Sequence, residues 1–456
     1  MASNRMSPQH AAVVGIARAL RTLSRRTGRG GTTVPGRVLL RLDAHAIERL
    51  GRRLDDGSVL LSATNGKTTT ASMLASILER AGERVIRNRA GSNMHWGVAT
   101  ALLDAGSRRG ELGLFEVDEA WLGDVARALH PRAFVLGNLF RDQLDRYGEL
   151  ELIADRWAEI VARHAGASAF VLNADDPLVA DLGRGRPLVT YFGVEDDTLA
   201  LPTLQHAADS KHCRRCGHAY RYAAIYLGHL GRYRCPHCGQ ERPRPDVAAE
   251  RVTLRGMAGT DVVLRTPAGR VDVTLPLPGL YNVYNALAAV AAATALDVER
   301  GAMRGGLEHV AAVFGRAETI PIGSAEVAIL LVKNPAGTNE VLRTLALEEG
   351  ELDLWLALND RIADGRDVSW IWDADFELLA GRVRRATCSG TRAEEMALRL
   401  KYAGIDAPIS VERDLGRSLD GALDGARRVY ALPTYTALLE LRDLLAERGV
   451  ARRWSD

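Results

Sequence analysis

Residues 62–70 read SATNGKTTT, and this short stretch decides the predicted fold. The apolar run VLLSA leads into it and the helical pattern TASMLASILERAG follows it. A strand, a tight loop and a helix N-terminus in this order present backbone N–H groups to phosphates, although Leu61 replaces the first glycine of the full Walker pattern. We expect Lys67 to neutralise β- and γ-phosphate charge and Thr68 to offer its hydroxyl to Mg²⁺. Backbone N–H groups would come from Thr64, Asn65 and Gly66. The stretch therefore predicts a nucleoside triphosphate site.

The composition indicates a globular protein with more than one domain. The chain has 456 residues, of which 47% are hydrophobic and 25% are charged, and this length predicts roughly two to three domains. A formal net charge of +2 gives no global field that would attract nucleic acid or an anionic membrane. The sequence has neither a secretory h-region nor an apolar run long enough to span a bilayer, so we expect a cytoplasmic protein.

The pattern of apolar runs divides the chain into three zones. Residues 1–55 hold a basic amphipathic helix, AAVVGIARALRTLSRR, and a Gly-rich link, which predict an extension packed on the next domain. In residues 56–312 strand and helix patterns alternate, which predicts a mostly parallel sheet covered by helices, interrupted by an insertion at 205–245. Residues 313–456 start a second α/β series that resembles a nucleotide-binding fold.

Acidic residues follow one of the apolar strands, in the segment FEVDEAWLGD. Glu116, Asp118 and Glu119 would lie at the carboxyl end of that strand, where open α/β sheets place their ligands. Mg²⁺ prefers hard oxygen ligands, and Glu116, flanked by two apolar residues, is the preferred candidate. Taken alone, Asp118 or Glu119 would also fit a solvated helix cap.

Four of the five cysteines form two close pairs, CRRC at 213–216 and CPHC at 235–238. Two Cys-x2-Cys knuckles at this separation are typical of a zinc ribbon, and a closed four-thiolate site leaves no open position for catalysis. The sequence therefore predicts a structural Zn²⁺ held by Cys213, Cys216, Cys235 and Cys238.

Several motifs occur in the order and at the intervals seen in the Mur ligases, which join amino acids to peptidoglycan precursors through an acyl phosphate. These motifs are SATNGKTTT, EVDEA, GNLFRDQLDRYGE, LNADDP, PGLYNVYNALAA, FGRAE and LVKNPAGTNEVL. Because RDQLDRYGE, the cysteine insertion and DGRDVSWIWDADFE are also present, the chain resembles most the MurT family, the synthetase subunits of lipid II isoglutaminyl synthase. The resemblance implies an α/β fold with a Mur ligase-like central P-loop domain, an inserted zinc ribbon and a C-terminal Rossmann-like α/β domain.

The resemblance also implies roles for single residues. Lys67 and Thr68 match the family's phosphate and Mg²⁺ contacts, and Glu116 matches its Mg²⁺ carboxylate. Arg316 resembles the arginine that reaches the γ-phosphate from the domain joint, and Lys333 stands where related ligases place a cation near the substrate. Asn282 and Asn285 resemble the asparagines near the adenine, and Asn173, Asp175 and Asp176 would lie beside the same pocket.

Three positions depart from the family pattern. Ala63 replaces the first glycine common in the phosphate loop, and Gln143 stands where many members have a histidine. Trp157 falls near the position of a carbamylated lysine that bridges a second metal, so the number of Mg²⁺ ions stays open. The short N-terminal zone favours a lipid-linked substrate over one held by a UDP group.

The loop NDRIADGRDVSWIWDADFELL, residues 359–379, combines aspartates with two tryptophans, a composition enriched at protein interfaces. By resemblance, this region meets a GatD-like glutaminase subunit and contributes an aspartate that orients the partner's catalytic histidine. The candidates are Asp364, Asp367 and Asp373. Cys388, in ATCSGTR, lacks the first glycine of a Gly-x-Cys-x-Gly nucleophile elbow, so we expect the glutaminase to be another chain in a heterodimer.

The expected reaction is ATP-dependent amidation of the α-carboxyl group of D-glutamate in the lipid II stem peptide, through an acyl phosphate and with ammonia from the partner. The substrate would place the enzyme at the inner face of the cytoplasmic membrane, in peripheral contact only. An amino-acid-adding ligase of the folylpolyglutamate synthetase type is the alternative within the superfamily. A nucleic-acid-binding ATPase is the alternative outside it, allowed by the arginines of the ribbon but not called for by the other motifs. These arginines are Arg214, Arg215, Arg221, Arg232 and Arg234.

Overall fold

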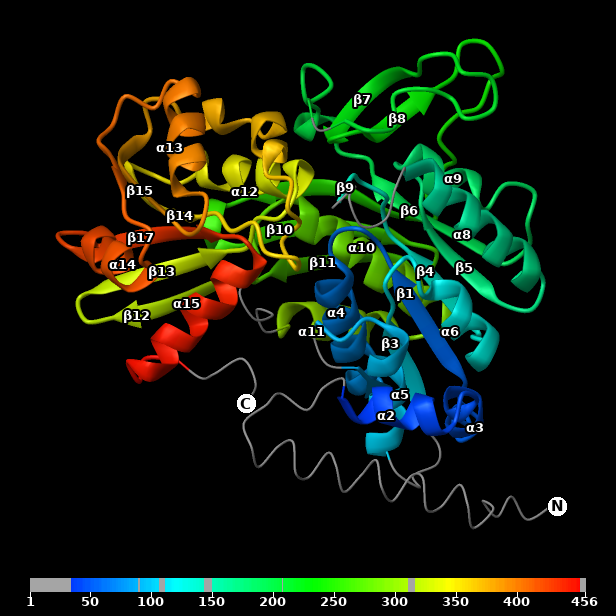
Figure 1. Ribbon diagram of the computed structural model, residues 1–456. Helices are drawn as coiled ribbons and strands as arrows, with labels where there is room; N and C mark the ends of the chain where they lie inside the picture. The colour runs from blue at the N-terminus through cyan, green and yellow to red at the C-terminus, as the bar shows by residue number, and fades with distance from the viewer. Residues whose placement is uncertain are drawn as a thin grey trace.

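The computed structural model describes residues 34–88, 91–105, 111–142, 150–206, 208–310 and 316–451, without the side chain of Arg316. The basic helix expected before residue 34 lies outside these ranges, as do Gln143 and the proposed domain boundary at 312/313. Two large sheets, each with helices on both faces, stand side by side, and a small hairpin projects beside them (Figure 1). The predicted α/β fold is confirmed.

The first sheet contains nine strands in the order β11-β10-β9-β6-β5-β4-β1-β3-β2. From β2 to β9 every neighbouring pair of strands is parallel. The remaining strands, β10 and β11, continue from β9 as an antiparallel meander at the other edge. The strand bounds are β1 Ser58–Ser62, β2 Val85–Arg87, β3 Leu112–Glu116, β4 Ala133–Leu136, β5 Ala169–Asn173, β6 Val189–Val194, β9 Val247–Leu254, β10 Thr260–Thr266 and β11 Gly269–Leu275.

Strand β1, which leads into the phosphate loop, lies between β4 and β3, third from the β2 edge of this sheet, and is buried along its whole length. Val59 and Leu61 pack into the core on one face, and Leu60 packs into the core on the other. A parallel strand covered on both faces needs a continuous apolar run, and this explains the three successive apolar residues Val59, Leu60 and Leu61. Because β1 pairs in parallel with both β3 and β4, its carboxyl end lies beside theirs.

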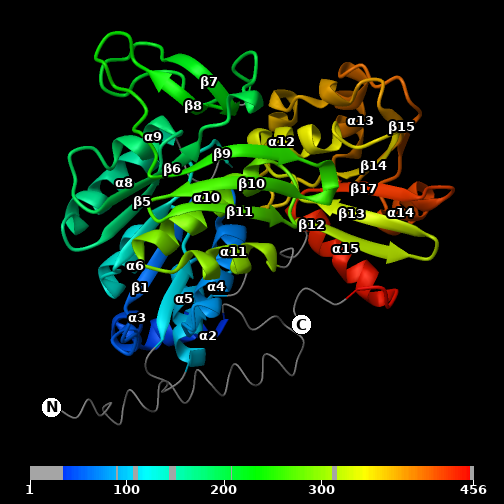
Figure 2. The ribbon, with the colours of Figure 1, turned by 180° about the vertical axis from the view of Figure 1, so that it is seen from behind.

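Helices α4, α10 and α11 cover one face of the first sheet, and α2, α3, α5, α6 and α8 cover the other (Figures 1 and 2). The expected Ala-rich helix is α10, whose small side chains let it lie directly on the strands. The helix bounds are α2 Val34–Leu42, α3 Ala46–Gly51, α4 Lys67–Arg80, α5 His95–Ala105, α6 Leu122–Leu129, α8 Leu150–His164, α9 Pro177–Asp181, α10 Leu280–Ala295 and α11 Arg300–Glu308.

The insertion forms the antiparallel hairpin β7 Arg221–Leu227 and β8 Leu230–Arg234, between β6 and β9. It is separate from both large sheets (Figure 1). The hairpin tip nevertheless reaches the C-terminal part of the chain, because Arg343 Nη1 donates to the Tyr226 carbonyl oxygen at 2.9 Å.

The second sheet has six strands in the order β12-β13-β17-β14-β15-β16, all parallel except the β12–β13 hairpin. Helices α12 and α13 pack on one face, and α14 and α15 pack on the other. The bounds are β12 Arg316–Ile322, β13 Ala325–Leu330, α12 Pro335–Leu345, β14 Leu352–Ala357, β15 Val383–Ser389, α13 Ala393–Tyr402, β16 Ile409–Val411, α14 Leu415–Leu423, β17 Arg428–Pro433 and α15 Tyr435–Glu447. None of the helices in the described ranges combines the length and the apolar composition needed to cross a bilayer.

Candidate functional site

The phosphate loop ends on Gly66, the residue that precedes helix α4. Its φ angle of 87° lies in the left-handed region, and a Cβ atom at this position would lie 1.9 Å from Asn285 Oδ1. Only glycine meets both conditions without strain. The turn directs the chain into α4, whose first N–H groups have no carbonyl partner inside the helix and can donate to an anion such as a phosphate. The predicted strand, loop and helix therefore occur as expected.

Asn138, just after β4, holds the loop in this shape. Asn65 N donates to Asn138 Oδ1 at 2.9 Å, Asn138 Nδ2 donates to the Asn65 carbonyl at 3.0 Å, and Thr64 N donates to the Asn138 carbonyl at 2.9 Å. Asn138 belongs to the GNLFRDQLDRYGE motif, and the sequence alone predicts no role for it. The available signal was an asparagine directly after a parallel strand, where an amide can bond to a neighbouring loop.

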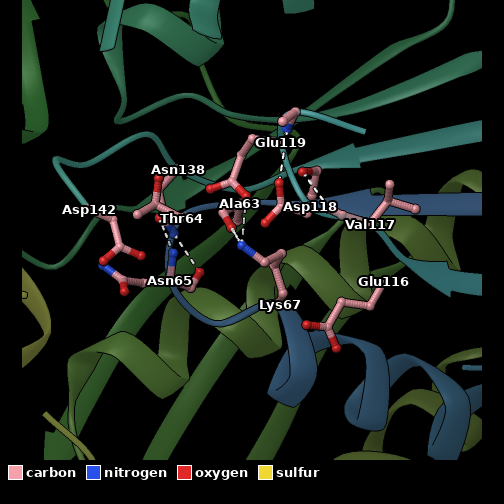
Figure 3. Close-up of polar contacts among 12 residues, drawn as sticks. Ala63, Thr64, Asn65, Lys67, Glu116, Val117, Asp118, Glu119, Asn138 and Asp142 are labelled. Atoms are coloured by element: carbon pink, nitrogen blue, oxygen red, sulfur yellow. Dashed lines mark hydrogen bonds and ion pairs between the residues drawn. The ribbon is translucent and has the colours of Figure 1, made fainter. Parts of the chain in front are cut away.

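The Lys67 side chain is buried, with its amine between the Ala63 carbonyl oxygen and Glu119 Oε2 (Figure 3). The Nζ–Oε2 distance is 2.8 Å. Burial acts to lower the pKa of Lys67, but the charges of Glu119, Asp118 and Glu116 outweigh burial and raise it. The amine is therefore held cationic at the start of α4. The interpretation of Glu119 as a solvated cap does not describe this geometry, because Glu119 is the partner of Lys67.

Thr68, the residue after Lys67, lies beside the Glu116 carboxylate. Thr68 Oγ1 donates to Glu116 Oε1 at 3.1 Å, and the Glu116 backbone is fixed by Asn88, whose Oδ1 accepts from Glu116 N at 3.0 Å. Two oxygen ligands at about 2.1 Å from Mg²⁺ in an octahedron are about 3 Å apart, so this pair fits adjacent positions around that ion. Asp118 instead accepts a hydrogen bond from Ala120 N at 3.1 Å.

The two asparagines of α10 belong to a series of hydrogen bonds that reaches Thr70, near the start of α4. Asn285 Oδ1 accepts from Thr70 Oγ1 at 3.2 Å, and Asn285 Nδ2 donates to Asn282 Oδ1 at 3.0 Å. Asn282 in turn donates to the Pro278 carbonyl at 2.8 Å. Asn285 thus faces the phosphate loop, whereas Asn282 lies behind it and orients it.

The NADD segment, residues 173–176, connects the end of β5 to α10 and to neighbouring loops through buried hydrogen bonds. Asp175 is fully buried, and it accepts hydrogen bonds from Tyr284 at 2.7 Å and from Arg242. Burial raises the pKa of Asp175, while the charge of Arg242 opposes that rise. Asp176 caps α9 through Leu178 N and also accepts from Leu139 N, and Asn173 accepts from Asp175 N. These side chains thus have structural partners inside the protein.

Lys333 and Asn334 bring the second sheet to the loop. Lys333 Nζ pairs with Asp142 and donates to the Thr64 carbonyl at 3.2 Å. Asn334, which precedes α12, exchanges side-chain hydrogen bonds with Asn65 at 3.0 and 3.4 Å. Sequence reasoning placed Lys333 near the substrate but missed Asn334, although an asparagine before Pro335 is a common helix cap.

A cavity opens between the loop, α10, the hairpin tip and α12, with about 820 Å³ of empty space including its open side. Its walls include Gly66 of the loop and Thr69 of α4, Tyr281 and Tyr284 of α10, and Leu227 and Leu230 of the hairpin. Ligand pockets have mainly apolar and aromatic walls, so the chemistry of this cavity suits the base of a nucleotide. Lys333 also lines it, whereas the side chain of Arg316 is outside the described residues.

The four predicted metal ligands converge. The sulfur atoms of Cys213, Cys216, Cys235 and Cys238 all lie within 4.8 Å of one another. The Cys213–Cys238 and Cys216–Cys235 sulfur distances are 3.5 and 3.4 Å. Four thiolates at about 2.3 Å from a tetrahedral Zn²⁺ are about 3.8 Å apart, so the cluster fits such an ion with small adjustments. His218 and His237 stack on each other beside the cluster and are both exposed.

The loop at 359–379 presents its three candidate aspartates differently. Asp364 is buried, and its carboxylate accepts hydrogen bonds from the backbone N–H, at 2.7 Å, and hydroxyl of Thr436. Burial raises the pKa of Asp364, and Thr436 opposes that rise. Asp367 is exposed and has its pKa lowered by hydrogen bonds from Ser369, and Asp373 lies 3.4 Å from Arg141.

Aromatic and aliphatic side chains near these aspartates are exposed. Trp372 is 47% exposed and packs edge-on against Tyr402, which is 70% exposed, and Ile362 is 71% exposed. Ile362 and Thr436 border a surface hollow of about 590 Å³. Exposed aromatic groups of this kind are enriched at protein interfaces.

Two family profiles match the chain. The Mur ligase middle domain matches residues 62–234, and the MurT ligase C-terminal domain matches residues 331–438. The chain is 32% identical over 433 residues to the lipid II isoglutaminyl synthase (glutamine-hydrolyzing) subunit MurT of Staphylococcus aureus (strain N315), covering 95% of this chain and 97% of that protein. It is 33% identical over 434 residues to the corresponding subunit of Streptococcus pneumoniae (strain R6), covering 94% and 95%.

Solved structures share the fold. A pseudomurein peptide ligase type C from Methanothermus fervidus has a TM-score of 0.69 and 24% identity, covering 88% of this chain and 81% of that one. A folylpolyglutamate synthase from Mycobacterium tuberculosis, complexed with ADP, has a TM-score of 0.61 and 15% identity, covering 95% and 98%. At these identities the similarity shows the fold alone.

Proposed function

The chain belongs to the MurT family of Mur ligase-like synthetase subunits, and from this premise we propose that it converts the α-carboxyl group of D-glutamate in the lipid II stem peptide to an amide, giving D-isoglutamine. The observation that carries the proposal is the similarity to MurT subunits along nearly the whole chain. The cationic Lys67 at the start of α4, close to three carboxylates, supplies the chemistry that such a reaction needs.

The carboxylate must first be activated. A carboxylate oxygen of the substrate attacks the γ-phosphorus of ATP, the bond to the β-phosphate oxygen breaks, and ADP leaves. Ammonia then attacks the acyl carbon, inorganic phosphate leaves, and the nitrogen loses a proton to give the amide. Lys67 and Arg316 would stabilise the charge on the phosphoryl group as it moves. Lys333 and Asn334 connect the C-terminal part of the chain to the phosphate loop, and closure of this contact would exclude water from the acyl phosphate.

Thr68 and Glu116 would hold the Mg²⁺ that accompanies ATP, since their oxygens are already spaced as adjacent ligands. When bound, the ion neutralises phosphate charge. Asn285 would stand beside the nucleotide, with Asn282 holding it in place. Thr64, Asn65 and Gly66 would give the loop its phosphate-facing N–H groups, held by Asn138.

The ammonia would come from a GatD-like glutaminase partner. Cys388 does not suit this task here, because it is buried and burial raises its pKa to about 12, which disfavours the thiolate nucleophile. One aspartate among Asp364, Asp367 and Asp373 would instead orient the catalytic histidine of the partner, and the exposed Trp372 beside them suits such an interface. A lipid-linked substrate would place this complex at the inner face of the cytoplasmic membrane.

The cysteine cluster would hold a structural Zn²⁺ through Cys213, Cys216, Cys235 and Cys238. The ribbon arginines do not favour the alternative of a nucleic-acid-binding surface, since four of the five named from sequence pair with carboxylates. These pairs are Arg214–Asp155, Arg215–Asp181, Arg232–Asp197 and Arg234–Glu241.

Product analysis separates amidation from the alternative of amino-acid addition. Lipid II would be incubated with ATP, Mg²⁺ and ammonium chloride, with and without free amino acids. The proposal predicts an amide in every reaction that contains ammonium, whereas an amino-acid-adding ligase would extend the stem peptide only when an amino acid is present.

A further inference from the structure

One buried carboxylate in the nucleotide cavity has no role in the reaction described above. Glu340 lies on α12, on the same helix face as Gly337 and Val341, and all three line the cavity. Its side chain is only 2% exposed. A carboxylate buried among apolar walls carries a substantial desolvation cost, so its retention at this position calls for a polar partner.

Arg343 holds one of the two carboxylate oxygens of Glu340. Arg343 Nη1 donates to Glu340 Oε1 at 2.7 Å and to the Tyr226 carbonyl of the hairpin at 2.9 Å. Burial raises the pKa of Glu340, and the charge of Arg343 opposes that rise. Within the described ranges no protein donor reaches Glu340 Oε2, although the residue borders the cavity. One oxygen is therefore fixed by protein, and the other remains available to a ligand.

We propose that Glu340 selects the base of the nucleotide, by accepting a hydrogen bond on Oε2 from the exocyclic amino group of adenine. The inference rests on the ATP-dependent reaction proposed above and adds the residue that determines which purine is used. A 6-oxo purine would place a carbonyl oxygen against this carboxylate, where two acceptors repel and neither is satisfied. The site therefore favours ATP over ITP.

The test compares kcat/KM for ATP and ITP in amidation by the full-length chain with ammonium salt as nitrogen source. The wild type should favour ATP roughly 10- to 100-fold, the effect of one hydrogen bond to a charged group. In Glu340→Gln the new amide must turn its carbonyl oxygen to Arg343, which only donates, so its NH₂ group faces the cavity. The ATP-to-ITP ratio should then fall by about 10-fold or more, because an amide donor suits the 6-oxo group.

Asp353→Asn is the matched control. Like Glu340, Asp353 on β14 is a buried carboxylate paired with an arginine: it is 7% exposed and lies 2.8 Å from Arg384. Unlike Glu340, it does not line the cavity. This variant should keep the wild-type ratio. Equal losses for ATP and ITP in Glu340→Gln would show that Glu340 only stabilises the helix and would overturn the proposal.

Two further measurements keep the proposal testable if Glu340→Gln does not fold. Purine riboside 5′-triphosphate lacks only the 6-amino group, and equal kcat/KM for it and for ATP in the wild type would overturn the role of Glu340. Calorimetric dissociation constants for ADP and IDP give the same comparison without turnover, with ADP expected to bind more tightly. Wild-type protein that discriminates ADP from IDP but forms no amide would contradict the proposed reaction and leave the base-selecting role supported.

Discussion

The side-chain amides of Asn65 and Asn334 hydrogen-bond to each other in both directions, at 3.0 and 3.4 Å, although the residues are 269 positions apart. Asn65 belongs to the phosphate loop, and Asn334 is the N-cap of α12, where its Oδ1 also accepts from Gly337 N at 2.9 Å. One residue thus both starts the helix that carries Glu340 and attaches that helix to the loop. The position of the second sheet is thereby coupled to the phosphate site.

This double role can be separated by two substitutions of Asn334. Asp at this position can still cap α12 but cannot donate to Asn65 Oδ1, so Asn334→Asp should keep thermal stability and lower kcat/KM for ATP several-fold. Asn334→Ala loses the cap as well and should cost about 1 kcal/mol of unfolding free energy in addition. Unfolding curves and ATP kinetics would be measured on both variants. Full ATP activity in Asn334→Asp would contradict a role of the Asn65–Asn334 pair in closing the contact between α12 and the phosphate loop.

Lys67→Ala should abolish ATP-dependent amidation, because it removes the amine proposed to balance phosphate charge at the start of α4. The pKa of Lys67 is raised above its ordinary value of 10.5, so its ion pair with Glu119 stabilises the fold fully below that pH and loses this effect only as pH rises through the higher folded pKa. The variant should therefore lose about 3 kcal/mol of stability, by an amount constant across neutral pH.

The control for Lys67→Ala is Lys401→Ala, at an exposed lysine of α13, which should keep both activity and stability. Amidation rates and denaturant unfolding at several pH values provide the measurements. Normal turnover by a folded Lys67→Ala protein would contradict the phosphate-loop assignment.

The sequence predicted those parts of this site that depend on local order. Gly66 and Lys67 could be predicted because a strand, a loop and a helix start are adjacent in the chain, and the cysteines because their spacing is itself the metal motif. Glu119, Asn138 and Asn334 could not be predicted in the same way. Their partners lie 52, 73 and 269 positions away, and only the order of strands in the sheets brings them together.

Cys213→Ser should lower the zinc content toward zero and destabilise the hairpin, because a structural site contributes its binding energy to folding. The tip of that hairpin lines the cavity beside the phosphate loop and accepts the Arg343 hydrogen bond, so affinity for ADP should fall as well if this cavity holds the nucleotide. Cys388→Ala is the control, since Cys388 is buried in the second sheet away from the cluster and should keep the metal. Elemental analysis showing no zinc in the wild-type protein would contradict the assignment.

If the loop at 359–379 completes the active site of a glutaminase, one of the changes Asp364→Asn, Asp367→Asn and Asp373→Asn should nearly abolish glutamine-dependent amidation. Loss of a triad carboxylate typically costs about 10⁴-fold in turnover. The same variant should still amidate with ammonium salt, because the loop residues are not part of the phosphate site. Equal loss of glutamine-driven and ammonium-driven rates would assign the loop to the ATP site instead.

The most direct test of the central claim follows the nitrogen atom. The full-length chain would be incubated with lipid II, ATP, Mg²⁺ and ¹⁵N-ammonium chloride, and the stem peptide examined by mass spectrometry while ADP and phosphate are quantified. We predict one ¹⁵N atom in an amide on the D-glutamate α-carboxyl group for each ADP formed, and no product with Lys67→Ala. A stem peptide without ¹⁵N, or one lengthened by an amino acid, would contradict this prediction.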